Sequence, residues 1–111
     1  MFERGTILSV SLGGGSGRKP RPAVVVQASD LEFPDTVIVT PLTGGERGDL
    51  AIKPVFVPDA KNGLLEPSSL MTQRIASVRK FDVGNFIGMM SEDDMERVDA
   101  ALALVLGLDR S

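Results

Sequence analysis

The feature that most restricts the fold of this chain is a series of short, β-branched apolar segments followed by one amphipathic segment. The apolar segments cover residues 6–12, 24–27, 36–42, 52–57, 69–78 and 83–90. Each has the composition and length of a strand, and glycine, proline, asparagine and aspartate separate most of them. Pro41 and Pro54 lack a backbone donor, so we expect each to lie at a sheet edge or where a strand departs into a loop.

The final segment carries the signals of an α-helix. Ser91 followed by Asp94 is similar to a capping box, and Gly107 is a suitable C-terminal stop. Apolar side chains recur between them at helical spacing, at Met95, Val98, Leu102 and Val105. Further leucines widen this surface and predict a helix that docks deeply and is available to a second subunit: Leu104, Leu106 and Leu108. The order of elements predicts a mostly β fold, a small bent antiparallel sheet or barrel with this helix packed on it.

The length of the chain, 111 residues, predicts a single domain over 1–111. At this size a homodimer is a natural way to bury more apolar surface. Hydrophobic residues make up 42% and charged residues 24%, close to the averages of soluble globular proteins. Because no apolar run approaches the roughly 18 residues of a membrane span, and the start lacks the order of a secretory signal, we expect a cytoplasmic protein without a membrane association.

The chain contains neither cysteine nor histidine. Disulfides, thiolate catalysis, cysteine-ligated metals and the Ser-His-Asp arrangement are therefore excluded. An enzyme built from these residues also lacks the commonest general acid and base. Glu92, Asp93 and Asp94 are adjacent and fan out around a helix, so they indicate capping rather than a metal site. We expect no metal and no cofactor.

The net charge of −3 by itself argues against a nucleic-acid partner, because phosphates are neutralised by lysine and arginine. The distribution of charge changes this view. Basic residues gather in two groups, Arg18, Lys19 and Arg21, and Arg74, Arg79 and Lys80. An acidic protein of this kind can present one basic face. The glycine-rich loop before the first group is not a P-loop, since a strand signature rather than a helix follows it.

Several short blocks occur in a characteristic order over nearly the whole chain. Arg4-Gly5 opens the first strand, Arg21-Pro22 precedes an apolar strand, and Pro41-Leu42-Thr43 follows the next one. Gly63-Leu64-Leu65, residues 69–73, Ile87-Gly88 and the closing segment 91–108 continue the pattern. In this order and spacing the chain resembles the MazF/PemK family of toxins from type II toxin–antitoxin systems.

The resemblance implies an SH3-like small barrel of the CcdB/MazF/PemK type with a terminal helix, assembled as a homodimer. It implies a metal-independent endoribonuclease that cleaves single-stranded RNA at short sequences. A cognate antitoxin would cover the same groove with an acidic tail. The family's catalytic arginine and threonine fall on Arg21 and Thr43.

Residues around this pair are candidates for RNA contacts, namely Arg18, Lys19, Thr72, Gln73 and Arg74. The chain departs from the family pattern at two of the neighbouring places. The loop before Arg21-Pro22 lacks the acidic residue that many relatives carry, and Thr72 stands where many have aspartate or glutamate.

The chemistry of RNA cleavage fits these residue types. RNA supplies its own nucleophile, the 2′-hydroxyl, so an enzyme needs mainly to position the strand and stabilise charge. The guanidinium of Arg21 stays protonated and binds phosphate oxygens in a bidentate way, and Thr43 offers a hydroxyl donor. The general base is open among four acids that the sequence does not rank: Asp30, Asp35, Glu46 and Glu66.

Two other functions remain open at this stage. Residues 71–78 are similar to CcdB-like toxins, which bind DNA gyrase without catalysis, and the missing carboxylates fit a protein that is not an enzyme. Against this alternative, the chain ends without the tryptophan that CcdB uses on gyrase. The other alternative is a catalytically silent structural or RNA-binding module, in which Arg21 is a solvated charge and Thr43 only starts a turn.

Overall fold

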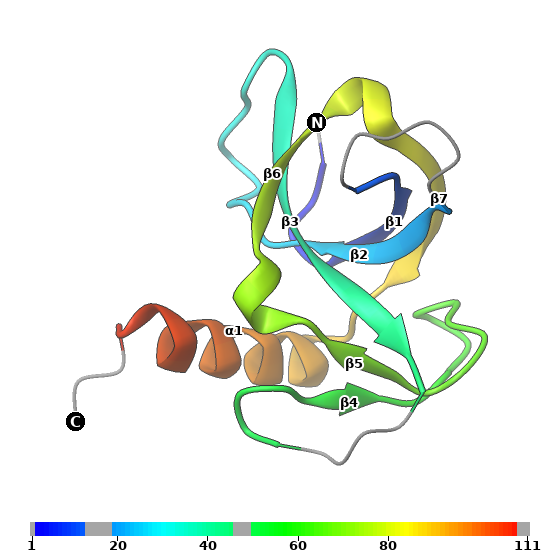
Figure 1. Cartoon of the computed structure of the whole chain (residues 1–111), viewed down its shortest axis with the longest axis vertical. Coiled ribbons are helices and arrows are strands. Elements are labelled where there is room, and N and C mark those ends of the chain that lie inside the picture. Colours follow the sequence, from blue (N-terminus) through cyan, green and yellow to red (C-terminus); the bar gives the residue numbers. More distant parts are fainter. Residues whose placement is uncertain (1, 13–18, 46–49, 109–111) are drawn as a thin grey trace.

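The computed structural model describes residues 2–12, 19–45 and 50–108, and shows a bent antiparallel sheet crossed by one helix (Figure 1). Its strands are β1 (Thr6–Val10), β2 (Arg21–Val25), β3 (Thr36–Gly44), β4 (Val55–Phe56), β5 (Ser68–Leu70), β6 (Ala76–Arg79) and β7 (Val83–Met89). Two short 3-10 turns, η1 (Thr72–Arg74) and η2 (Lys80–Asp82), flank β6, and the helix α1 covers Glu92–Leu106. The prediction of a mostly β fold with a C-terminal helix is confirmed.

Strand β3 organises the sheet. The strand order is β4-β5-β3-β2-β1-β7, and β6 also pairs with β3. The first part of β3, Thr36–Val39, pairs with β6, whereas its last part, Leu42–Gly44, pairs with β5. Among the described residues β7 pairs only with β1 and β6 only with β3, so the sheet curls strongly without closing. The expected barrel is therefore a loose description of an open, bent sheet.

Both faces of the sheet are buried, because alternate residues of each strand point to opposite sides. Ile7 of β1 and Val24 of β2 face α1 and pack in one apolar cluster with Phe56 and Val98. Leu8 and Val10 belong to a second cluster, in which they pack with valines across the curl of the sheet: Val25, Val37, Val39 and Val78. The sheet thus supplies most of its own core, and the helix covers only one side.

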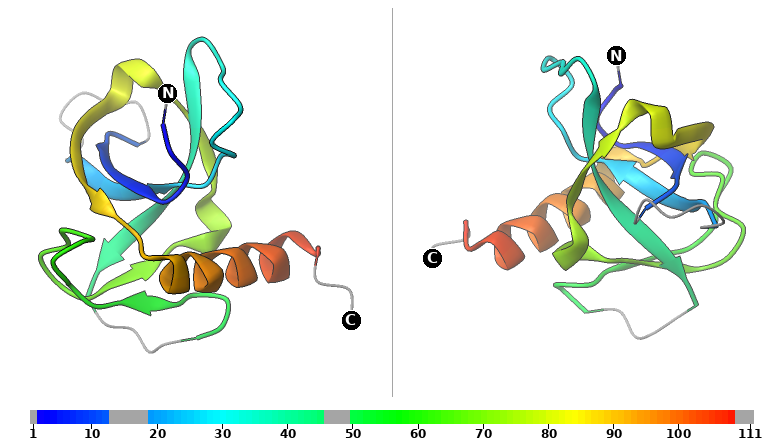
Figure 2. Two further views of the ribbon diagram at one scale, coloured as in Figure 1. Left: turned by 180° about the vertical axis from the view of Figure 1, so that it is seen from behind. Right: turned by 45° about the horizontal axis from the view of Figure 1, so that its top comes forward.

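The helix begins and ends where the sequence predicts. The backbone N–H of Asp94 donates to the Ser91 hydroxyl at 3.1 Å, and Gly107 takes a left-handed conformation with φ 73°. Its packing differs from the expected deep docking. Only Val98, Ala101 and Leu102 are buried, and the last turns run past the sheet (Figure 2). Exposed apolar side chains therefore lie at the helix end: Leu104, Val105, Leu106 and Leu108.

The long strand expected over residues 69–78 is wrong, because the structure divides it into β5, η1 and β6. The register along β3 explains the break. Between the pairs Leu42–Leu70 and Val39–Ala76, β3 advances by three residues while its partner advances by six. The extra residues are taken up in η1, where the Arg74 N–H donates to the Met71 carbonyl at 2.9 Å.

The segment between β4 and β5 is held by a buried amide. The Asn62 side chain is fully buried, and its oxygen accepts from the N–H groups of Asp59 at 3.1 Å and Leu64 at 3.0 Å. Its amide nitrogen donates to the Val57 carbonyl at 2.9 Å. Gly63 follows with φ 68°, and a Cβ there would lie 2.2 Å from the backbone oxygen of Ile87. The Asn62-Gly63 pair, a common turn signal, thus fixes this segment against β7.

Replacing Asn62 with alanine should lower the free energy of unfolding by about 3 kcal/mol, because it leaves buried N–H and C=O groups without partners. Denaturant unfolding of the variant measures this change. Asn85→Ala is the matched control, since Asn85 is exposed on β7. Equal unfolding midpoints for the two variants would contradict a structural role for the Asn62 amide.

Candidate active site

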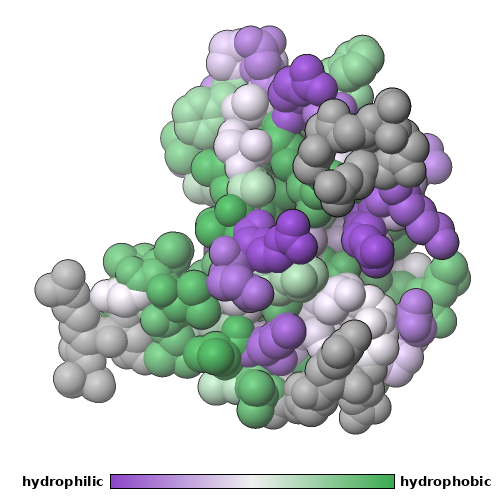
Figure 3. Space-filling view, in the orientation of Figure 1, coloured by the Kyte–Doolittle hydropathy of each residue, from purple (hydrophilic) through white to green (hydrophobic). Residues whose placement is uncertain are grey.

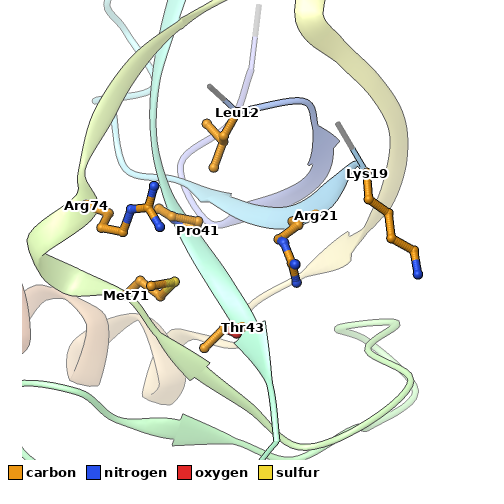
Figure 4. Close-up of a pocket in the computed structure, with 7 residues that line it drawn as sticks. All are labelled: Leu12, Lys19, Arg21, Pro41, Thr43, Met71 and Arg74. Atoms are coloured by element: carbon orange, nitrogen blue, oxygen red, sulfur yellow. The ribbon is translucent and has the colours of Figure 1, made fainter. Parts of the chain in front are cut away.

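A polar cavity of about 270 Å³ lies where β2 and β3 meet the β5–η1 connection. Its walls are formed by Leu12, Lys19, Arg21, Pro41, Thr43, Met71 and Arg74 (Figure 4). The charged groups in this wall are all cationic, and no acidic side chain of the described residues lines it. Figure 3, in the orientation of Figure 1, shows hydrophilic side chains gathered near the centre of this face, while apolar ones gather over α1.

The pairing of β2 with β3 brings Arg21 and Thr43 together. Ala23 pairs with Pro41 in this antiparallel ladder. Continuing the same register by two residues places Arg21 across from Thr43 and on the same side of the sheet. Figure 4 shows the Arg21 side chain directed toward the end of β3 that carries Thr43. Two residues far apart in sequence thus share one cavity, as the resemblance implied.

The cations of the cavity have no charged partner in the part of the chain that the structure describes. Among the described residues, Lys19, Arg21 and Arg74 form no ion pair and no side-chain hydrogen bond. Outside the cavity, Arg4 binds Asp99 at 2.5 Å and Arg79 binds Asp82 at 3.0 Å. Unpaired like charges that face one cavity repel each other, and a bound anion relieves this repulsion. The cavity is therefore suited to a phosphate group.

A further ion pair lies outside the cavity. The Lys80 ammonium donates to the Glu32 carboxylate, and this hydrogen bond lowers the pKa of Glu32 below its ordinary value. Both residues lie near the far end of β3 from Thr43, so this charge pair holds the β2–β3 connection and not the cavity.

The other residues expected to contact RNA lie in different environments. Lys19 and Arg74 line the cavity, but Thr72 is buried and its hydroxyl faces the Leu70 carbonyl at 3.5 Å. Gln73 is exposed and does not line this cavity. The expected set divides because residues 72–74 form a 3-10 turn instead of an extended strand with two faces. Arg18 lies outside the described residues.

Sequence reasoning missed the apolar walls of the cavity. Leu12 follows β1, Pro41 lies between the two halves of β3, and Met71 joins β5 to η1. Nothing local distinguishes these side chains from core residues. The signal that could have located them was their proximity in sequence to a candidate site residue, above all Pro41 shortly before Thr43.

The four candidate bases lie in different places. Asp30 and Asp35 are exposed in the β2–β3 connection, at the opposite end of β2 from Arg21. Glu46 lies outside the described residues. Glu66 lines a second cavity that also borders Arg21. Of the described candidates, only Glu66 is therefore near the proposed site.

Two kinds of feature are absent from the described residues. These residues hold no group of three or more histidine, cysteine, aspartate or glutamate side chains arranged to bind a metal ion. Within the same ranges, no helix has both the length and the apolar character needed to cross a membrane.

A family model connects this geometry to known proteins. The model for PemK-like, MazF-like toxins of type II toxin–antitoxin systems matches residues 3–106. The chain belongs to this toxin family. A relative of the same kind is the probable endoribonuclease MazF of Mycolicibacterium smegmatis, which is 30% identical over 107 residues, 96% of this chain and 98% of that protein.

Solved structures share the fold of this toxin. An endoribonuclease in complex with its cognate antitoxin, from a mycobacterial species, superposes with a TM-score of 0.79 at 20% identity, with full coverage of both chains (100%). The Mycobacterium tuberculosis toxin MazF-mt6 gives a TM-score of 0.75 at 24% identity, covering 94% of this chain and 99% of that one. At these identities the likeness concerns the fold. Family membership favours the MazF/PemK reading over the CcdB-like alternative.

Proposed function

We infer that this toxin is a metal-independent endoribonuclease that cleaves single-stranded RNA at short sequences. The observation that carries the proposal is one cavity lined by Thr43 and by three cations without an acidic partner among the described residues, Lys19, Arg21 and Arg74. The name of the Mycolicibacterium relative, a probable endoribonuclease, supports the same activity. Fixed guanidinium groups supply here the positive charge that phosphoryl transfer requires.

The reaction begins with the 2′-hydroxyl of the substrate. Its oxygen attacks the adjacent phosphorus, the bond from phosphorus to the 5′-oxygen breaks, and a 2′,3′-cyclic phosphate and a 5′-hydroxyl result. The 2′-proton passes to a base, and the departing 5′-oxygen takes up a proton. Arg21 binds the equatorial oxygens as negative charge accumulates, and the Thr43 hydroxyl donates to one of them. Arg21 is a poor base because it stays protonated.

Lys19 and Arg74 bind the flanking phosphates. Both line the cavity and neither has a partner among the described residues. Since the backbone of a single strand carries one charge per nucleotide, cations on two sides of Arg21 hold the strand across it. The exposed Gln73 lies beyond this wall and is available to bases, while the buried Thr72 is not.

The proposal includes a homodimer and an antitoxin. Large exposed apolar side chains support further burial between subunits: Leu31, Phe33, Phe81, Phe86, Leu106 and Leu108. Light scattering should then give twice the 11.8 kDa of one chain. An antitoxin with an acidic segment would neutralise the cationic cavity and exclude RNA. The RNA substrate places the toxin in the cytoplasm.

Replacing Arg21 with alanine should lower the rate of RNA cleavage at least about 100-fold, because charge in the transition state loses its main stabiliser. The melting temperature should stay nearly unchanged, since the side chain is exposed and has no ion pair within the described part of the chain. The assay uses a long single-stranded RNA in EDTA and detects cyclic-phosphate ends. Arg79→Ala, on an arginine paired outside the cavity, is the control. Cleavage by Arg21→Ala at the control's rate would place the site elsewhere, and RNA binding without cleavage by the unaltered chain would favour the silent module.

The Thr43 hydroxyl is tested by a matched pair of variants. Thr43→Val keeps the shape of the side chain but removes the donor, so kcat should fall about 100-fold. Thr43→Ser keeps the donor and should retain most of the activity. Single-turnover cleavage rates measure both. A serine variant as slow as the valine variant would show that packing, and not the hydroxyl, matters at this position.

The role of Arg74 is tested by the salt dependence of binding. With an RNA whose 2′-hydroxyls are replaced by hydrogen, binding can be measured without cleavage. Plotted on logarithmic scales, the association constant falls with salt concentration. Losing one phosphate contact should make this slope less steep by about 0.7 for a single strand. We expect this for Arg74→Ala and no change for Arg79→Ala. Equal slopes for the two variants would remove Arg74 from the RNA path.

A further inference from the structure

A second cavity, of about 570 Å³, borders the same arginine. Lys19 and Arg21 line both cavities, and the strand β3 separates them. The first cavity is lined by Pro41 and Thr43, the second by Leu42 and Gly44. Since successive residues of a strand point to opposite faces, the two cavities lie on opposite faces of the end of β3.

The second cavity combines apolar walls with one carboxylate. Pro22, Leu64, Leu65 and Ile87 contribute apolar surface, and Glu66 is the acidic residue that lines it. Its volume is within the range of cavities that hold small organic molecules, and such sites pair an apolar lining with a few fixed polar groups. Leu65 lines this cavity next to buried Leu64 and is itself 99% exposed. An apolar side chain in this position offers a surface for the flat face of a ring.

The Glu66 carboxylate extends from a hydrogen-bonded backbone and, among the described residues, is free to accept hydrogen bonds. It lies against Gly44, where a Cβ would be 2.5 Å from its Oε2 atom. Its backbone is fixed, because the Ser68 hydroxyl donates to the Glu66 carbonyl at 2.9 Å and Gly45 donates to the Pro67 carbonyl at 3.1 Å. Among the described residues the carboxylate itself has neither a hydrogen bond nor an ion pair.

We propose that this second cavity is a nucleobase subsite, which takes the base next to the phosphodiester bound by Arg21. The inference rests on the proposed RNA cleavage and adds a basis for sequence selection. An ionised carboxylate only accepts hydrogen bonds. The edge of guanine presents two neighbouring N–H donors, whereas the single N–H of uracil lies between two carbonyl oxygens that a carboxylate repels. The subsite therefore selects guanine over uracil.

Glu66 is assigned to base selection and not to proton transfer, because of its side of the sheet. Thr43 faces the first cavity, and Gly44, against which the carboxylate lies, faces the second. The glycine is part of the device, since any larger side chain at position 44 would displace the carboxylate. Gly44 does not have a positive φ, so the effect of a side chain at this position would fall on the end of the Glu66 side chain and not on the backbone conformation.

The test compares cut sites in a pool of random-sequence RNA for the unaltered chain and two variants. Glu66→Gln replaces an acceptor with an amide that also donates, so the preference for guanine over uracil at one position beside the cut should fall about tenfold. Gly44→Ala keeps the carboxylate but displaces it, and should shift the same position in the same direction. Preferences at all other positions should stay unchanged. Glu96→Gln makes the same chemical change on an exposed glutamate of α1 and is the control.

Three results would overturn the subsite. Cleavage with the same base preferences in all the variants would show that the carboxylate reads no base. A uniform loss of kcat at every sequence in Glu66→Gln, together with loss of a limb of the pH profile, would make Glu66 a proton acceptor instead. If the unaltered chain cuts no RNA, the proposed function fails and the subsite falls with it, which separates that failure from the first two results.

Discussion

The pairing of β3 with three other strands is the constraint on which the rest of the structure depends. One edge of β3 pairs with β2, and the other pairs first with β6 and then with β5. The β2 pairing sets Arg21 across from Thr43, and the change of partner on the other edge produces the turn η1 that carries Arg74 into the same cavity. A shift of register by one residue would turn these side chains to the opposite faces of the sheet. The chemistry of the site is thus an outcome of backbone hydrogen bonding far more than of local sequence.

Charge is distributed so that an acidic protein presents a cationic site. The chain carries a net charge of −3, yet the cations of the cavity have no acidic partner among the described residues. Acids elsewhere pair with other cations, as Asp99 does with Arg4, or lie at the start of α1, where the helix dipole stabilises them. Net charge alone therefore misleads about the partner, because recognition of a phosphate depends on the local field. The same field suits an acidic antitoxin segment, so the proposed function assigns one set of cations to both substrate and inhibitor.

Arg21 occupies the border between two cavities of different character. The cationic one holds the groups suited to the phosphodiester, and the apolar one, with Glu66 against Gly44, is suited to a base. An RNA strand that crosses Arg21 would thereby place a phosphate on one face of the end of β3 and a base on the opposite face. Asn62 links this arrangement to stability, because its buried amide fixes the segment from which Leu65 and Glu66 extend. This segment therefore contributes both to folding stability and to the proposed base binding.

The sequence by itself determined the features that depend on neighbouring residues. The Ser91 cap, the Gly107 stop, the Asn62-Gly63 turn and most strands follow from local propensity, and the family resemblance named Arg21 and Thr43. Tertiary structure decided what depends on distant partners. No proline or glycine marks the break at η1. It arises from the register of β3, which also buries Thr72. The exposure of the last turns of α1 follows from the limited width of the sheet, and the position of Glu66 from a contact with a glycine in another strand. The physical reason is that local sequence signals act over a few residues. Strand pairing, side-chain burial and the electrostatic field are set by groups that only folding brings together.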